Sequence, residues 1–255
     1  MRRGSGLDGQ RALTGRRILW LVLFDLAAVL VVAGLVALTV WQTHRRAWKL
    51  DLIARIEARI SAPATPAPPR ERWPEVSAAS HEYARVTATG RWLEDRSALV
   101  QAVTELGGGY WVITPLMQED GTAVLVNRGF IPADKRDPAD WKARSEGPVT
   151  VTGMLRMPEP GGAFLQTNDP PADRWFSRDV EAIAASRRLP ATAPYFIDAE
   201  RAPDHSGLPV PGLTVIAFSN NHLIYAITWG ILALMAAAGA VFVNKEALYP
   251  SAERD

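Results

Sequence analysis

The segment Asn221-His-Leu-Ile-Tyr-Ala-Ile-Thr-Trp229 opens an apolar run that carries no charge before Lys245. The 21 residues from Leu223 to Val243 would extend about 32 Å as a helix, enough to cross a bilayer core of roughly 30 Å. The segment therefore predicts a membrane-spanning helix over residues 222–243, with a polar stretch at one edge of the membrane.

Three polar or aromatic side chains share one stripe of this predicted helix. At about 100° per residue, His222, Tyr225 and Trp229 fall within about 60° of one another, starting at the level of the lipid headgroups. Tyr225 and Trp229 are equally typical of an aromatic belt, with an asparagine as the helix cap. A histidine at a membrane edge is a ready neutral-imidazole ligand, so we interpret His222 as the candidate functional residue.

A second apolar run lies near the N-terminus. Ile18–Val40 is too long for the core of a signal peptide, and no small-residue cleavage site follows it. We expect a retained transmembrane helix over 18–40 that continues as a helix to about residue 60. Residues 1–17 are rich in arginine and indicate a cytoplasmic basic arm, although the far side of the span is basic too.

Asp25 is the one charge inside this first span, about 10 Å from Ile18 along a helix. A carboxylate within the membrane costs on the order of 3 kcal/mol and is a functional candidate by default. Water or an arginine at the inner edge could equally satisfy it. Both interpretations stay open.

The exit of the first span is aromatic and basic. A helix there has an aromatic face with Trp41, His44 and Trp48, and a polar face with Gln42, Arg45 and Lys49. One interpretation is a tryptophan belt with cations that reach the headgroups. The alternative is a wall facing His222, whose basic groups could bind carboxylates of a ligand or phosphates of membrane lipid.

The composition argues against several functions. A net charge of +1 over 255 residues gives no reason to expect nucleic acid as a partner. The chain has no cysteine, which excludes disulfides, thiolate metal sites and a cysteine nucleophile. The four histidines, at positions 44, 81, 205 and 222, lack the spacing of a metal site, so no protein-only metal site is expected.

Between the spans, a stiff Pro/Ala linker at 61–72 leads to an extramembrane domain at 73–219. Alternation and turn residues predict strands at 82–90, 97–104, 109–117, 123–130, 148–157, 195–198 and 212–218. Short helices are expected at 137–143 and 178–188, a hairpin turn at 118–122, and a loop or bulge at 107–109. The predicted fold is an α+β membrane protein, in which two transmembrane helices flank a mostly antiparallel, barrel- or sandwich-like β domain.

The conspicuous polar residues of this domain form no catalytic set, and no serine lies in a Gly-x-Ser-x-Gly motif. These residues are Asn127, Arg156, Glu159, Asn168, Arg174, Arg178 and Asp179. The adjacent Arg178 and Asp179 are typical of a local ion pair or a helix cap. We therefore do not expect an enzyme.

A series of motifs, in order and spacing, resembles the Surfeit locus family of cytochrome c oxidase assembly factors, also called Shy or Surf proteins, and looks closest to its bacterial members. The motifs are Trp41-Gln42, Arg45, Trp48-Lys49 and Leu52-Ile53; Tyr110–Leu116; Val124–Pro132; Gly153–Arg156 with Pro158-Glu159; Asn168; Trp175 with Arg178-Asp179; Tyr195–Asp198; and Asn221–Trp229. One departure is Gly230, where the family usually has an aromatic residue.

The resemblance implies a protein of the bacterial inner membrane with both termini and the 244–255 tail in the cytoplasm, and with its main domain in the periplasm. It implies a chaperone for haem a on its way to oxidase subunit I, with haem a synthase as a further candidate partner. His222 would ligate the haem iron, with His44 as a loosely held candidate for a second ligand. Tyr225, Trp229 and Trp41 would surround the ring, and Arg45 and Lys49 would pair with the propionates.

Two rival functions remain. In the first, the protein is a scaffold that stabilises subunit I without binding haem, and the motifs Asn127–Phe130 and Trp175–Asp179 are partner surface. In the second, it is an oxidoreductase or hydrolase of the cell envelope, for which the sequence offers no residue constellation.

Overall fold

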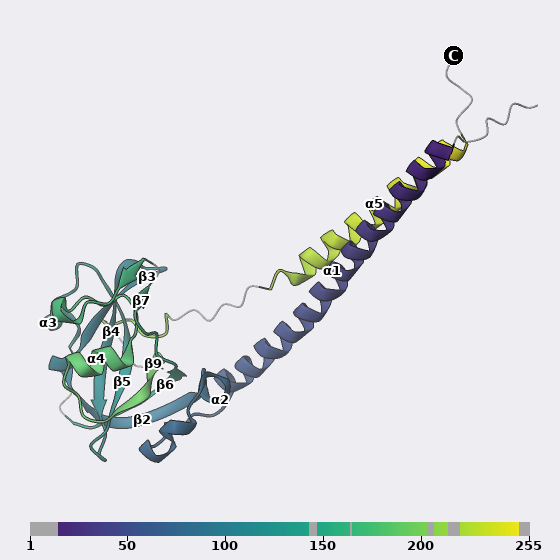
Figure 1. Cartoon of the computed structure of the whole chain (residues 1–255). Helices are drawn as coiled ribbons and strands as arrows, with labels where there is room; N and C mark the ends of the chain where they lie inside the picture. The colour runs from purple at the N-terminus through teal and green to yellow at the C-terminus, as the bar shows by residue number, and fades with distance from the viewer. Residues whose placement is uncertain (1–14, 143–146, 164, 203–206, 214–219, 250–255) are drawn as a thin grey trace, which may run out of the picture. The chain divides into compact units, whose positions relative to one another are not determined.

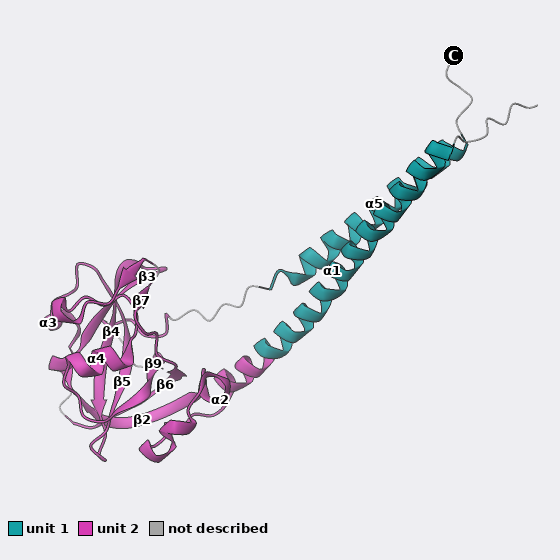
Figure 2. Cartoon of the chain, viewed as in Figure 1, with its two compact units in different colours: residues 1–53, 218–255 teal, residues 54–217 magenta. Residues whose placement is uncertain are grey.

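The computed structural model describes residues 15–142, 147–163, 165–202, 207–213 and 220–249 (Figure 1). The chain divides into two compact units, one of residues 1–53 with 218–255 and one of residues 54–217 (Figure 2). The described part of the first unit is a pair of helices. The second unit is a β-barrel with short helices around it.

Two helices are long and apolar enough to cross a membrane, α1 (Gly15–Ser61) and α5 (His222–Leu248). Their most apolar windows have a mean hydropathy of 2.8 and 2.1. α1 ends one residue past the predicted end at about residue 60, and α5 begins at His222. Asn221 occupies the N-cap of α5, but its side chain makes no capping hydrogen bond, because its backbone (φ −90°, ψ 5°) is not extended.

The two helices pack antiparallel, since Gln42 of α1 contacts His222 and Asp25 contacts Asn244. Along residues 15–45 of α1, the least exposed residues recur at alternating steps of four and three: Leu21, Asp25, Ala28, Val32, Leu35, Thr39 and Gln42. This 3.5-residue repeat is the seam of a left-handed helix pair. The facing stripe of α5 is built mainly of small residues, among them Ala226, Gly230, Ala233, Ala237 and Ala240. Small residues let two helix backbones approach closely in a membrane.

The second unit contains a closed five-stranded barrel. Its strands are β2 (Arg85–Trp92), β6 (Val149–Arg156), β9 (Thr192–Ala199), β5 (Ala123–Pro132) and β4 (Gly107–Met117), in that order around the sheet. Pairing of Arg91 and Trp92 with Met117 and Leu116 closes it. The barrel neighbours pair antiparallel except β5 and β9, which run parallel. The predicted fold class is confirmed, with a barrel in place of the sandwich alternative.

Short elements complete this unit. They are β1 (Thr65–Pro66), β3 (Ala98–Thr104), β7 (Gly162–Ala163) and β8 (Gln166–Thr167); the helices α2 (Ala78–His81), α3 (Pro138–Trp141) and α4 (Val180–Ser186); and the 3-10 turns η1 (Arg70–Glu75), η2 (Glu94–Arg96) and η3 (Pro170–Ala172). The strand expected at 212–218 falls mainly on residues outside the described part of the chain.

The barrel strands bury side chains on both faces. One apolar cluster, which includes Val86, Leu116 and Val126, draws residues from all five barrel strands and fills the interior. A second cluster lies outside the barrel wall, where α4 covers alternate residues of β5 and β9 such as Leu125 and Phe196. Strand β5 is therefore buried along almost its whole length, as a strand covered on both faces must be.

Two sequence predictions need correction. Gly107–Gly109 is the start of strand β4 rather than a loop, and a side chain at Gly109 would overlap the carbonyl oxygen of Ile131. The linker predicted as extended over 61–72 is free of helix only over 62–69, because α1 includes Ser61 and η1 begins at Arg70. It is also docked on the barrel: β1 pairs with β2, and the Pro68 oxygen accepts a 2.9 Å hydrogen bond from Tyr195 Oη. The prolines after Ser61 end α1, but the segment that follows is held against the barrel by these contacts.

Candidate functional site

The first turn of α5 presents His222 to α1. Its Nδ1 lies 2.8 Å from Oε1 of Gln42, whose side chain is buried in the seam of the helix pair with 8% of its surface exposed. The carbonyl oxygen of an amide can only accept, so the contact places a proton on Nδ1. In the described part of the chain, no hydrogen bond reaches the other ring nitrogen, Nε2. A neutral imidazole in this tautomer offers the Nε2 lone pair to a metal.

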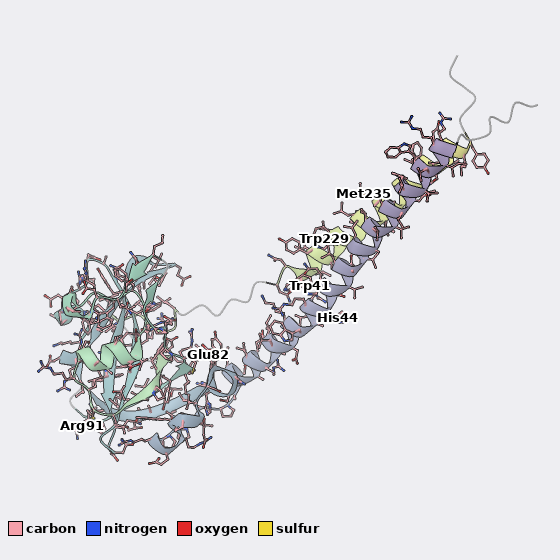
Figure 3. The ribbon with its side chains drawn as sticks, viewed as in Figure 1. Trp41, His44, Glu82, Arg91, Trp229 and Met235 are labelled. Atoms are coloured by element: carbon pink, nitrogen blue, oxygen red, sulfur yellow. The ribbon has the colours of Figure 1, made fainter. Side chains whose placement is uncertain are left out.

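The other members of the predicted stripe follow His222 along α5. Tyr225 is 52% exposed, and Trp229 is half-buried (Figure 3). Ala226, between them in the sequence, is buried in the seam. No hydrogen bond joins Tyr225 or Trp229 to His222 among the described residues. The helix therefore puts an apolar and aromatic surface next to the imidazole, open to whatever surrounds the helix pair.

The basic residues at the exit of α1 are only partly arranged as expected. The aromatic residues Trp41 and Trp48 and the histidine His44 are exposed. Arg45 is also exposed, and its guanidinium lies 4.1 Å from the ring centre of Trp48. Arg45 thus contacts Trp48, whereas Gln42 of the same predicted face is buried.

Trp41 lies on α1 next to Gln42 in the sequence (Figure 3), and Lys49 is half-buried. Within the described residues, neither forms a hydrogen bond or an ion pair with His222. The one residue of α1 that contacts the imidazole through a hydrogen bond is Gln42, which the sequence prediction left out of the site. Its position on the seam, seven residues after Leu35 and three after Thr39, is the signal that identifies it.

At the opposite end of the helix pair, Asp25 has a partner that the sequence prediction also missed. Nδ2 of Asn244 donates to Asp25 Oδ1 at 2.6 Å and to the oxygen of Ala240 at 3.0 Å. The amide of Asn244 thus replaces the water or arginine expected for this carboxylate. This hydrogen bond between the two helices is enough to explain a carboxylate at position 25, without a further function.

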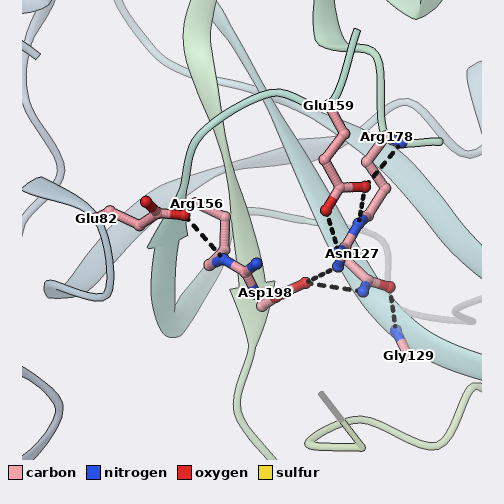
Figure 4. Close-up of polar contacts among 7 residues, drawn as sticks. All are labelled: Glu82, Asn127, Gly129, Arg156, Glu159, Arg178 and Asp198. Atoms are coloured by element: carbon pink, nitrogen blue, oxygen red, sulfur yellow. Dashed lines mark hydrogen bonds and ion pairs between the residues drawn. The ribbon is translucent and has the colours of Figure 1, made fainter. Parts of the chain in front are cut away.

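A polar network in the barrel unit is centred on Asp198, which is 3% exposed (Figure 4). Its other side chains are Glu82, Asn127, Arg156, Glu159 and Arg178. Asp198 accepts hydrogen bonds from Asn127 Nδ2 at 2.8 Å, Arg156 Nη1 at 3.0 Å and Arg178 Nη1 at 3.4 Å. Arg178 also donates to Glu159, and Arg156 Nε lies 3.6 Å from Glu82. Within the part of the chain that the structure describes, Arg156 Nε is buried without a hydrogen-bond partner, and the other contacts tie Asp198 to three neighbouring side chains, as expected of a network that holds strands together.

In this network, the pKa values of Arg178 and Glu159 shift in the direction that favours their ion pair. Burial lowers the pKa of Arg178, but hydrogen bonds and charges from Glu159 and Asp198 outweigh burial, so its pKa is raised. Burial raises the pKa of Glu159, and Arg178 reverses the sign and leaves it below the usual value. The neighbouring Asp179 caps α4, accepting from the Ala182 amide at 3.1 Å, which confirms one of the two roles predicted for it.

The motifs assigned to a partner surface in the scaffold hypothesis are largely core. Asn127, Phe130, Trp175 and Ser177 are all buried. While the barrel is folded, a partner would meet mainly the half-buried members of the two motifs, such as Arg128 and Phe176. Among the described residues, no group of three or more His, Cys, Asp or Glu side chains could hold a metal ion.

Comparison with known proteins places the chain. The SURF1 family model matches residues 29–234. Human Surfeit locus protein 1 is 35% identical over 207 residues, which cover 74% of this chain and 67% of the human protein. The mouse protein of the same name is 31% identical, covering 79% and 69%. A SURF1-like protein of Monosiga brevicollis is 35% identical, covering 81% and 82%. The match runs from the middle of α1 through the barrel into α5, and on this evidence the chain belongs to the SURF1 family.

Proposed function

We propose that this chain is an assembly factor for haem–copper cytochrome c oxidase. It binds haem a transiently through His222 at the outer edge of the bacterial inner membrane and helps its insertion into subunit I. The barrel would lie in the periplasm and both termini in the cytoplasm. Membership of the SURF1 family supports the oxidase, and the orientation of His222 supports the haem.

The observation that carries the proposal is the 2.8 Å contact between His222 Nδ1 and Gln42 Oε1. Ligating histidines almost always donate their second ring nitrogen to an acceptor, which fixes the ring and keeps the metal-binding nitrogen free. The donor set thus fits a single neutral imidazole that would hold the iron. One such ligand without a strong second one suits a carrier that must release its cargo.

The surroundings of His222 also fit a large apolar cargo. Tyr225, Trp229 and Trp41 offer aromatic surface beside the imidazole, and burying apolar area contributes roughly 25 cal/mol per Å². Arg45 and Lys49 are the basic residues proposed for the propionates; Arg45 contacts the Trp48 ring, and Lys49 is half-buried. Haem a would supply the iron, while the chain supplies the ligand, the aromatic walls and the exclusion of water.

The test is the visible spectrum of detergent-purified protein from cells that make haem a. Wild-type protein is expected to carry haem, and His222→Ala is expected to lose it. His81→Ala, which changes a half-buried histidine of the barrel unit, is the control and should keep a full complement. His44→Ala should shift the spectrum only if His44 is the second ligand.

Retention of a full haem complement with an unchanged Soret band in His222→Ala would contradict the ligand assignment. Wild-type protein without haem that still co-purifies with subunit I would favour a scaffold. Turnover of a small substrate by the purified protein would favour an enzyme of the cell envelope.

A further inference from the structure

We infer that Gln42 is a positioning residue that fixes the tautomer of His222 and sets how firmly that histidine holds a metal. The part about metal binding rests on the proposed function. The part about the tautomer of His222 concerns the protein without cargo and can be tested on its own.

The geometry of Gln42 is that of a held side chain. It is the residue of α1 that closes the seam next to the start of α5, and 8% of it is exposed. Neighbouring positions differ: Trp41 and Thr43 are exposed, and the Thr43 hydroxyl bonds to the Val40 oxygen of its own helix. Burial in the seam limits the rotamers open to Gln42 and leaves its amide oxygen directed at the imidazole.

The chemistry follows from which amide atom meets the ring. Gln42 Oε1 accepts from Nδ1–H, so the proton of the neutral ring cannot lie on Nε2. The opposite amide orientation would donate a hydrogen bond to Nδ1 and favour the ring proton on Nε2, where it would oppose coordination. Gln42, in the orientation seen here, therefore favours the tautomer in which His222 can act as a ligand.

The type of acceptor also matters. A carboxylate in this place would draw the Nδ1 proton strongly and make Nε2 a more basic ligand, because hydrogen bonds to charged groups are roughly twice as strong as neutral ones. An amide oxygen leaves Nε2 at moderate basicity. A glutamine thus suits reversible binding, whereas a glutamate would suit a resident metal.

The first arm of the test is nitrogen NMR of His222 in the cargo-free protein labelled at histidine. The wild type is expected to show the Nδ1–H tautomer, and Gln42→Met, which keeps the length of the side chain without the acceptor, should show a mixture. Thr43→Val, an exposed neighbour, should leave the wild-type signal. A wild-type ring protonated on Nε2, or an unchanged tautomer in Gln42→Met, would overturn the inference.

The second arm uses protein loaded with haem a. Gln42→Met is expected to lose roughly 10- to 100-fold in affinity, the usual loss when the hydrogen-bond partner of a ligating histidine is removed. Gln42→Glu should restore binding, slow the release of haem to an acceptor protein and lower the reduction potential. Thr43→Val should match the wild type.

Equal haem affinities and equal reduction potentials in the wild type, Gln42→Met and Gln42→Glu would overturn the role of Gln42 while leaving His222 as the ligand. A wild-type protein that binds no haem would instead refute the proposed function, and the nitrogen NMR would still decide the tautomer. Rescue by Gln42→Glu separates lost hydrogen bonding from misfolding of the Gln42→Met variant.

Discussion

Asp25 Oδ1 of α1 accepts a 2.6 Å hydrogen bond from Asn244 Nδ2 of α5, so the carboxylate inside the first span is paired with the second helix. A polar pair at each end of an alanine-rich seam fixes the register of the two helices: Asp25 with Asn244 at one end, and Gln42 with His222 at the other. Such pairs specify an alignment that small apolar residues alone would leave loose.

Removing one partner of the Asp25–Asn244 pair should cost more than removing both. Asn244→Leu leaves a carboxylate without its donor and is expected to destabilise the helix pair by about 1–3 kcal/mol, whereas Asp25→Leu combined with Asn244→Leu should recover most of the loss. Thermal unfolding of the four proteins in detergent gives the double-mutant cycle. Purely additive losses would show that the contact does not couple the helices.

Asp198 should behave as a structural residue of the barrel. Asp198→Asn removes the charge that neutralises Arg156 and Arg178, two guanidiniums with 12% and 13% of their side chains exposed. Breaking a buried pair in this way typically costs about 3–5 kcal/mol. Denaturant unfolding followed by tryptophan fluorescence measures the loss.

The control is Glu75→Gln, which breaks an exposed pair with Arg72 and should change stability by less than about 1 kcal/mol. If Asp198→Asn keeps wild-type stability and yet loses co-purification with the oxidase, the network is a contact site rather than a support.

Local patterns in the sequence predict most strands of the barrel but not its closure. Val86 and Ala88 of β2 are buried and the residues between them less so, which is the alternation that the sequence shows. The parallel pairing of β5 with β9 and the pairing of β2 with β4 join segments far apart in the chain. This strand order depends on which faces of the strands are covered by α4 and by the interior cluster. The periodicity of a single segment does not contain that information.

The sequence points to His222 as a candidate residue but not to its partner Gln42, which was missed for a geometric reason. At 100° per residue, Gln42 falls on one face with Arg45 and Lys49. Packed helices follow a 3.5-residue repeat instead, which moves Gln42 onto the seam with Thr39. The choice between the two periods requires knowing that α1 has a partner helix along its apolar length.

Acid should weaken the barrel through Glu159. Although burial alone would raise the pKa of Glu159, hydrogen bonds and charge from Arg178 lower it below the usual value. The unfolded carboxylate takes up its proton near pH ~4.3, at a higher pH than the folded one, so stability falls as the pH drops below that value.

Glu159→Gln should be less stable than the wild type at neutral pH and should lose less stability on acidification. The free energy of unfolding measured in denaturant between neutral pH and the acid limb gives both values. An unchanged slope in Glu159→Gln would assign the acid sensitivity to other carboxylates.

Two adjacent glycines of β4 should respond in opposite ways to alanine. A Cβ at Gly109 would overlap the carbonyl oxygen of Ile131 and the ring of Phe130 on the neighbouring strand, whereas a Cβ at Gly108 meets no atom within 4 Å. Gly109→Ala must push β4 and β5 apart, because the obstruction includes backbone, and overpacking of this kind typically costs about 1–3 kcal/mol. Gly108→Ala should be neutral or slightly stabilising, since alanine has less freedom to lose on folding. Thermal unfolding of the two variants compares them directly, and equal stability would mean that β4 can shift at its first residues without disturbing the barrel wall.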